Sequence, residues 1–160
     1  MTDGDTPRAQ LNGEIITELH RYAGHVQQIG GTFAARHGLG AADLQALMLI
    51  VAGERSGQPV TPGELREALN FSSGSITGLI DRLEAAGHVY RGRDADDRRK
   101  VLLRQAAPAV AVARGFFGPI ARRTEAVLDD FTEPELDVVR RFLAALSTAM
   151  GEHRDDLRAR

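Results

Sequence analysis

The sequence contains no cysteine among its 160 residues. This absence excludes disulfide bonds, thiolate zinc sites and thiol-based peroxide sensing within the chain. Long apolar segments are missing as well, since the longest apolar run, residues 46–52, is far too short to span a bilayer. Residues 1–7 are polar and acidic, unlike a signal peptide. We therefore expect a cytoplasmic protein that does not enter a membrane.

The chain also lacks a strong excess of charge of either sign. Its net charge of −2 at pH 7 argues against a protein that binds nucleic acid through an overall basic surface. Any basic footprint must therefore be local, with the rest of the surface acidic. The length and the ordinary composition favour one domain over residues 1–160, with one sizeable core.

A short helix is predicted to begin at Thr61. Thr61 is a good N-cap, Pro62 suits the first helical position, and Glu64 completes a capping box with Thr61. Asn70 and Phe71 then leave the helical pattern, so this first helix is expected to end just before them.

A second short helix follows, capped by Ser72 or Ser73 and ended by Gly87. Its apolar positions follow the i, i+3, i+4, i+7 spacing of a buried face. They are Ile76, Leu79, Ile80 and Leu83. Two helices joined by so short a turn are typical of a helix-turn-helix, whose second helix enters the major groove of DNA.

Two β-prone segments come next, residues 88–90 and 100–103, and the polar segment between them is expected to be a hairpin tip. Residues 91–104 carry six basic side chains against three acidic ones. Alone, such a hairpin would be interpreted as a solvated loop. Directly after a helix-turn-helix it predicts a "wing" that reaches DNA phosphates or the minor groove. Residues 59–60 are expected to add a short strand beside it.

These elements resemble the MarR family of winged-helix transcription regulators. The matching residues are Thr61, Glu64, Leu65, Leu69, Ser73 and Thr77, the run Asp81–Gly87, and Asp97-Arg98-Arg99. The last of these is similar to the family's wing signature, Asp-x-Arg. Two departures stand out, because Gln105-Ala106 replaces the family's Leu-Thr and Gly78 lies where many members carry a larger side chain.

Long amphipathic helices are predicted on both sides of the winged helix. Apolar residues step by three and four from Leu11 to Phe33 and again from Leu136 to Met150. The winged helix does not need these helices for its own core, so their narrow stripes suggest packing across a twofold axis. Folding back on the same subunit is the alternative. The resemblance favours the dimer, because MarR regulators dimerise through their terminal helices.

The predicted fold is mainly α with a small β-hairpin wing. A winged helix-turn-helix lobe at residues 40–105 is flanked by long N- and C-terminal dimerisation helices at residues 10–37 and 108–150. Residues 1–9 are expected to be a disordered leader, and residues 152–160 are expected to fray.

The DNA-facing residues are expected on the second helix, the recognition helix, and on the wing. The exposed face of that helix carries small side chains, so specificity should depend largely on the wing and on DNA shape. Arg82 is expected to reach phosphate or guanine, or else to pair with Asp81 or Glu84. The wing arginine of the family falls at Arg99, which is expected to enter the minor groove. The full set of expected DNA-binding residues is Ser72, Ser73, Ser75, Thr77, Gly78, Arg82, Arg91, Arg93, Arg98, Arg99 and Lys100.

The resemblance also implies a small-molecule effector site where the long helices meet the winged helix. Candidate lining residues are Tyr22, His25, Gln28, Met48 and Phe116, although such side chains more often belong to a core. The acidic residues Asp94, Asp96 and Asp97 invite a magnesium-dependent enzyme as an alternative, but the basic residues around them favour a turn. No motif in the sequence requires catalysis, and we expect neither an enzyme nor a cofactor.

The predicted function is a sequence-specific transcription regulator. It would be a homodimeric repressor on a near-palindromic site in double-stranded DNA, released by a small-molecule effector. One alternative is a winged-helix protein-interaction module without an operator of its own. A second is a metal-responsive regulator that uses the histidines, of which His20 and His25 do not share a helix face cleanly.

Overall fold

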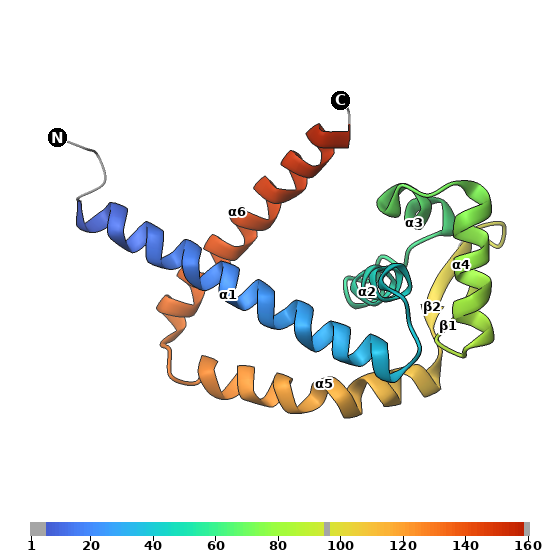
Figure 1. Ribbon diagram of the computed structural model, residues 1–160, viewed down its shortest axis with the longest axis horizontal. Coiled ribbons are helices and arrows are strands. Elements are labelled where there is room, and N and C mark those ends of the chain that lie inside the picture. Colours follow the sequence, from blue (N-terminus) through green and yellow to red (C-terminus); the bar gives the residue numbers. More distant parts are fainter. Residues whose placement is uncertain (1–5, 95–96, 159–160) are drawn as a thin grey trace. The chain divides into compact units, whose positions relative to one another are not determined.

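The computed structural model describes residues 6–94 and 97–158. Within these residues the chain forms six helices and two strands (Figure 1). In chain order they are α1 (Pro7–Arg36), α2 (Ala41–Arg55), α3 (Pro62–Leu69), α4 (Ser73–Ala85), β1 (Val89–Arg93), β2 (Val101–Gln105), α5 (Ala107–Leu128) and α6 (Glu133–Arg158). Packing divides the chain into two compact units, Met1–Val112 and Ala113–Arg160. The mainly α fold with a β-hairpin wing is as predicted.

The first helix begins earlier than the sequence pattern indicates. Thr6 caps α1 by accepting the N–H of Ala9 at 3.3 Å, and Pro7 occupies its first turn. The expectation of a disordered leader through residue 9 is therefore wrong for residues 7–9, while residues 1–5 lie outside the described part. The apolar stripe starts only at Leu11, so hydrophobic periodicity misses this first turn.

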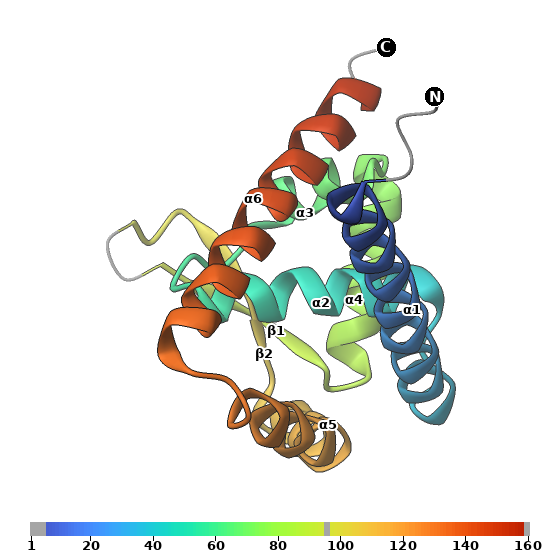
Figure 2. The ribbon, with the colours of Figure 1, turned by 90° about the vertical axis from the view of Figure 1, so that its left-hand side faces the viewer.

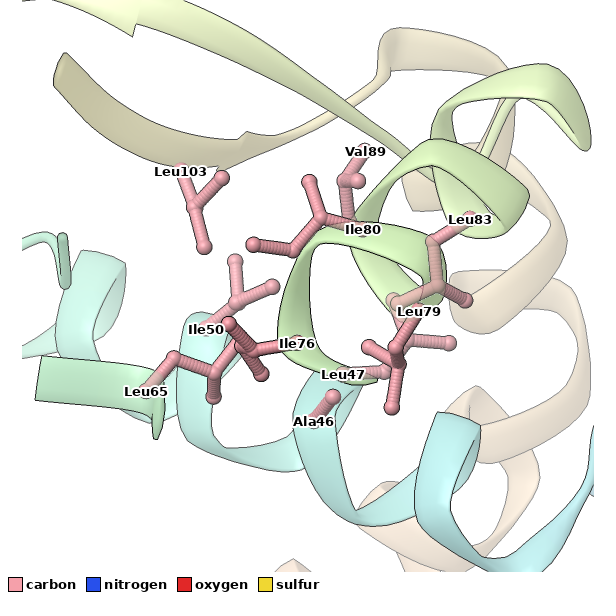
Figure 3. Packing of buried hydrophobic residues seen from close by; sticks show 10 residues of the cluster. All are labelled: Ala46, Leu47, Ile50, Leu65, Ile76, Leu79, Ile80, Leu83, Val89 and Leu103. Carbon is pink, nitrogen blue, oxygen red and sulfur yellow. The ribbon is translucent and has the colours of Figure 1, made fainter. Parts of the chain in front are cut away.

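The core of the first unit lies between α2, α3, α4 and the hairpin. The four apolar residues predicted for the buried face of α4 are all buried, with exposed fractions between 1% and 4%. They pack against other buried side chains (Figure 3), which are Ala46, Leu47, Ile50, Leu65, Val89 and Leu103. Burial of each large aliphatic side chain contributes about 1.5–3 kcal/mol, so this cluster fixes α4 on its lobe.

The helix-turn-helix has the predicted end groups. Thr61 Oγ1 accepts the N–H of Glu64 at 3.1 Å, and the Glu64 carboxylate accepts the N–H of Thr61 at 2.7 Å. Asn70 ends α3 in the left-handed conformation, with φ of 54°. Of the two serines left open by the sequence, Ser72 is the cap of α4 and accepts the N–H of Ser75 at 3.1 Å.

The end of α4 and the start of the hairpin are joined by a tight turn at Gly87. This glycine has φ of 72°, in the left-handed region that other residues rarely adopt. The N–H of His88 returns to the carbonyl of Leu83 at 2.9 Å, as in a Schellman motif. The turn sends β1 back along α4, so the wing lies beside the recognition helix.

The hairpin is longer than predicted. β1 and β2 run antiparallel and side by side (Figure 2), with Arg91 opposite Leu103 and Arg93 opposite Val101. The expectation that Arg91–Arg93 belong to the tip is therefore wrong, because backbone pairing extends through charged residues. The predicted strand at residues 59–60 is not formed either. A single backbone bond, from the N–H of Leu103 to the carbonyl of Val60 at 2.8 Å, joins that segment to β2.

The helix α6 of the second unit starts as predicted and ends later. Thr132 donates its N–H to the Glu135 carboxylate at 2.8 Å, which is one half of the expected capping box. The helix then continues to Arg158, so the prediction that residues 152–160 fray is wrong for residues 152–158. No helix within the described ranges is long and apolar enough to cross a membrane.

Candidate nucleic-acid interface

The face of α4 opposite its buried side is exposed and carries small side chains. Gly74, Thr77 and Gly78 all lie there. A Cβ placed on either glycine meets nothing within 4 Å, so neither glycine is needed for packing within the chain. The Thr77 hydroxyl donates to the carbonyl of Ser73 at 2.9 Å, and this bond occupies its proton. The face is smooth, and it has few groups with which to read bases.

The N-terminus of α4 gathers hydroxyl groups and one arginine from the preceding helix. Ser72, Ser73 and Ser75 are exposed, and the hydroxyls of Ser72 and Ser75 lie 2.8 Å apart. Arg66 Nη1 donates to Ser73 Oγ at 3.4 Å. The first N–H groups of a helix favour an anion, and the guanidinium adds to that preference. Sequence reasoning missed Arg66, which reaches this position only because α3 turns back onto α4.

Arg82 has a different partner from those considered in the sequence. Its Nη2 lies 2.7 Å from Asp43 Oδ1, instead of pairing with Asp81 or Glu84. Asp43 is only 7% exposed, and its other oxygen accepts the N–H of Gly40 at 2.9 Å. Asp43 therefore caps α2 and holds the guanidinium of Arg82 near the end of the recognition helix. Nothing in the local sequence marks Asp43, since it lies 39 residues from Arg82.

Arg91, an expected DNA-binding residue, is paired with two carboxylates of α4. Its Nη2 lies 2.7 Å from Asp81 Oδ1, and its Nη1 forms an ion pair with Glu84. Partial burial alone would lower the pKa of Arg91, but the hydrogen bonds and negative charges of the two carboxylates raise it overall. The guanidinium thus stays charged and faces α4.

The tip of the wing is a hydrogen-bonded turn built by two of its acidic residues. Asp94 Oδ1 accepts the N–H of Asp97 at 3.0 Å, and Asp97 Oδ1 accepts the N–H of Arg99 at 3.0 Å. The N–H of Lys100 returns to the carbonyl of Asp97 at 2.9 Å. The bond to Asp94 supports its interpretation as a turn residue, and Asp97 holds the backbone beside Arg99. Asp96, the third member of the acidic cluster, lies outside the described residues.

The basic side chains at the end of β1 and at the tip project into solvent. Arg93, Arg98, Arg99 and Lys100 are all exposed, and the Arg99 side chain is 97% exposed. Its Nε lies 3.8 Å from Asp97 Oδ1, which is beyond hydrogen-bonding distance. A guanidinium so exposed on an ordered turn is free to contact an external anion. The structure therefore leaves these four expected DNA residues available.

The expected effector residues are not gathered into a closed cavity within the first unit. Tyr22, His25 and Gln28 are exposed on α1, and Met48 is exposed on α2. The exposed fraction of Tyr22 reaches 70%. Phe116 belongs to the second unit, where its ring lies 4.9 Å from that of Phe117. The effector site stays a prediction.

The histidines were considered as metal ligands. Over residues 6–94 and 97–158, no group of three His, Asp or Glu side chains is placed to hold a metal ion. His88 lies near His37 and Asp43 instead. Burial lowers the pKa of His88, His37 lowers it further, and Asp43 opposes both effects. The metal-responsive alternative receives no support from this geometry.

Comparisons with known proteins place this winged helix in a family. Residues 37–100 match the model of the MarR family. The HTH-type transcriptional regulator YcgE of Bacillus subtilis is 34% identical over 100 residues, which are 62% of this chain and 65% of that protein. The repressor YetL of the same species is 23% identical over 142 residues, or 89% of this chain and 84% of the relative. Several other curated relatives are matched over only about half of their own length.

Solved structures share the fold at low sequence identity. A MarR family protein from Bacillus stearothermophilus has a TM-score of 0.58 at 23% identity, covering 89% of this chain and 96% of that one. The complex of S. aureus MepR with DNA has a TM-score of 0.51 at 16% identity, covering 84% and 98%. MepR bound to ethidium bromide has a TM-score of 0.53 at 16% identity, covering 84% and 95%. The family match and the shared fold together identify residues 37–100 as a winged helix-turn-helix of the MarR type.

Proposed function

We propose that this protein is a sequence-specific DNA-binding transcription regulator that works as a homodimer. The observation that carries the proposal is the pairing of two surfaces, the smooth exposed face of α4 and the exposed basic tip of the wing. The first fits a major groove, and the second fits the phosphates and minor groove beside it. The DNA complex of S. aureus MepR, a protein of the same fold, supports this assignment.

Charge is distributed as such a function requires. The chain as a whole has a net charge of −2, so an overall basic surface does not drive association. Arg93, Arg98, Arg99 and Lys100 concentrate positive charge on one hairpin, while Asp94 and Asp97 are used in its turn. Binding should therefore depend on docking the wing, and it should weaken as salt rises.

The homodimer is proposed from apolar side chains exposed on the terminal helices. Leu11, Ile15 and Val26 are exposed on α1, and Val139 and Leu143 are exposed on α6. They belong to longer series of apolar residues spaced three or four apart, so each helix carries an apolar stripe and not scattered apolar positions. Patches of this kind mark association surfaces in soluble proteins. A twofold dimer would present two recognition helices and two wings to one near-palindromic duplex.

Repression released by a small molecule is the finer part of the proposal. The relative YetL is named a repressor, and S. aureus MepR has been solved with ethidium bromide bound. In this chain the candidate effector residues are Tyr22, His25, Gln28, Met48 and Phe116.

Titration of a labelled random-sequence duplex at two salt concentrations tests the proposed function. A DNA-binding wing predicts that the logarithm of the affinity falls linearly with the logarithm of the salt concentration. Each phosphate contact contributes about one unit of slope. A protein-interaction module without an operator predicts no measurable binding at either concentration. That result would overturn the assignment to DNA.

A further inference from the structure

The side chain of Arg91 points to the recognition helix and not to the outside of the wing. In a strand, alternate residues share a face, so Arg91 lies on the same side as Val89, which is 2% exposed. Its cross-strand partner is Leu103, which is fully buried. Only 32% of the Arg91 side chain remains exposed. Arg91 therefore lies on the core-facing side of β1, where its side chain contacts α4.

Arg91 is bound to α4 at three points. Its Nη2 donates to Asp81 Oδ1 at 2.7 Å, and its Nη1 donates to Glu84 Oε2. Its backbone N–H also donates to Glu84 Oε1 at 2.9 Å. Asp81 and Glu84 are three residues apart, on successive turns of one helix face. A planar guanidinium can span two such carboxylates, which the single ammonium of lysine cannot do equally well.

The same contacts change the charge that α4 presents. Asp81 lies on the exposed side of the recognition helix, and its side chain is 59% exposed. Without a partner, Asp81 and Glu84 would place two negative charges beside DNA phosphates. Arg91 neutralises these two negative charges by pairing with them. Its positive charge is therefore not fully available to attract a DNA phosphate.

We infer that Arg91 is a positioning residue that fixes the wing against the recognition helix and masks the two carboxylates, instead of contacting phosphate. This inference rests on the proposed DNA-binding function. Two consequences distinguish it from direct contact. Removing Arg91 should leave the salt dependence of binding almost unchanged, and Glu84 should favour DNA binding although it is negatively charged.

A double-mutant cycle of Arg91→Ala and Glu84→Gln on the full chain tests the inference. The probe is a duplex that the wild-type protein selects from a random library. We expect each single variant to lose about three- to thirtyfold in affinity, the range for residues coupled through one network. In the Arg91→Ala background, Glu84→Gln should instead strengthen binding, because only an unpaired negative charge is then removed. If Glu84→Gln strengthens binding in the wild-type background as well, the inference is wrong.

The salt slope supplies the second readout. Arg98→Ala is the matched control, because Arg98 is an exposed residue of the wing tip, and losing it should lower the slope by about one. Arg91→Ala should leave the slope of the wild type unchanged. Arg91→Lys keeps the positive charge but cannot donate to both carboxylates as the guanidinium does, so it should recover only part of the affinity. A slope lowered by about one in Arg91→Ala, with full recovery in Arg91→Lys, would identify a phosphate contact instead.

A measurement without DNA separates failure of the inference from failure of the proposed function. Amide hydrogen exchange in β1 and β2 should accelerate in both Arg91→Ala and Glu84→Gln, while exchange in α6 stays unchanged. If the wild type selects no duplex, the proposed function fails, and the exchange data still test the attachment of the wing. Unchanged exchange in β1 and β2 in both variants would show that Arg91 does not hold the wing.

Discussion

Arginines of the wing have opposite environments, although they are close in sequence. Arg99 is almost entirely exposed at the tip, whereas Arg91 is held by Asp81 and Glu84. The difference comes from backbone position. Arg91 lies on the core-facing side of a strand, and Arg99 lies in a turn beyond the end of the sheet. Substitutions of Arg91 and of Arg99 should therefore affect DNA binding through different mechanisms and to different extents.

Arg99→Ala should weaken binding to the selected duplex by about 1–3 kcal/mol, the range for one good contact in the base region. A narrow A·T-rich minor groove concentrates negative potential, and a weakly hydrated guanidinium enters it more readily than an ammonium does. Arg99→Lys should therefore recover only part of the loss. Fluorescence anisotropy at fixed salt measures both variants, and full recovery by lysine would indicate a phosphate contact.

Asp97→Ala serves as the control for the order of the tip. The variant removes the carboxylate that accepts the Arg99 N–H and thereby helps to order the turn. We expect weaker binding, because the turn then loses order before it docks. Long-range electrostatics predicts the opposite sign, since a negative charge near DNA is removed. Tighter binding of Asp97→Ala at fixed salt would contradict a role for Asp97 in ordering the wing.

Glu64 links the stability of the winged helix to pH. The N–H and the hydroxyl of Thr61 donate to its carboxylate and lower its pKa from the ordinary value of 4.5. A carboxyl group with a lowered folded-state pKa stabilises the fold above its unfolded pKa, and this contribution is lost as pH falls through the folded value. Glu64→Gln should therefore destabilise the protein at neutral pH, with a difference from wild type that shrinks below pH 4.5.

Urea unfolding at fixed protein concentration and several pH values measures this difference. Glu67→Gln is the matched control, because Glu67 is in the same helix and its side chain is 74% exposed. Thr61→Ala removes the other half of the capping box and should cost about 1 kcal/mol at neutral pH. A Glu64→Gln effect that is independent of pH, or equal to that of Glu67→Gln, would contradict the role of the capping box.

Single side-chain roles follow from the sequence only where their partners are local. The capping box of Thr61 with Glu64 and the turn at Gly87 depend on neighbours within a few residues, so spacing alone predicts them. The partner of Arg82 is Asp43, 39 residues away, and no local pattern indicates it. The ion pairs of Arg91 with Asp81 and Glu84 were missed for the same reason, because a count of basic residues does not tell which carboxylates will face them.

The position of α4 depends on its buried stripe. Ile80 is 1% exposed at the centre of the cluster with Leu65, Leu79 and Leu103. Ile80→Ala should lower the free energy of unfolding by about 2–5 kcal/mol, because it removes buried surface and leaves a cavity. Thermal or urea unfolding measures this loss. Thr77→Ala, on the exposed face of the same helix, is the control and should cost much less. Equal losses would contradict the assignment of the two faces.

Helices and strands were predicted well in their centres and less well at their ends. Periodicity located the buried face of α4 and both terminal helices. It missed the first turn of α1, because Thr6 and Pro7 start the helix before the apolar stripe begins. Periodicity ended α6 too early, because the last turns of that helix are polar and give no apolar signal. It also made β1 too short, because a strand with paired backbone tolerates charged side chains. Hydrogen bonding decides these boundaries.

The surfaces of the terminal helices determine how the whole molecule should behave. Within the described residues, α6 has no residue in the buried class, and Leu143 in its apolar stripe is 46% exposed. If this stripe forms a dimer interface, Leu143→Glu should place a charge in it and favour the monomer. Sedimentation should then give a mass near 17.3 kDa, against twice that mass for the wild type.

Thr148→Glu is the control for this variant. On helical spacing Thr148 lies on the side of α6 opposite Leu143, so the added charge should leave the mass of the wild type unchanged. A wild-type protein that sediments as a monomer, or a dimer unaffected by Leu143→Glu, would contradict the proposed use of this stripe. Apolar spacing along the sequence predicts the stripe, but which surface covers it depends on a partner that the sequence does not name.

Selection of DNA by the purified full-length protein from a random duplex library, followed by sequencing, tests the central proposal most directly. Two winged helices related by a twofold axis predict a near-palindromic motif, with half-site centres about one helical turn, or roughly 34 Å, apart. Because the exposed face of α4 has few base-reading groups, conserved A·T-rich steps should appear where the wings meet the minor groove. Recovery of no motif, or of a motif without twofold symmetry, would contradict a homodimeric sequence-specific regulator.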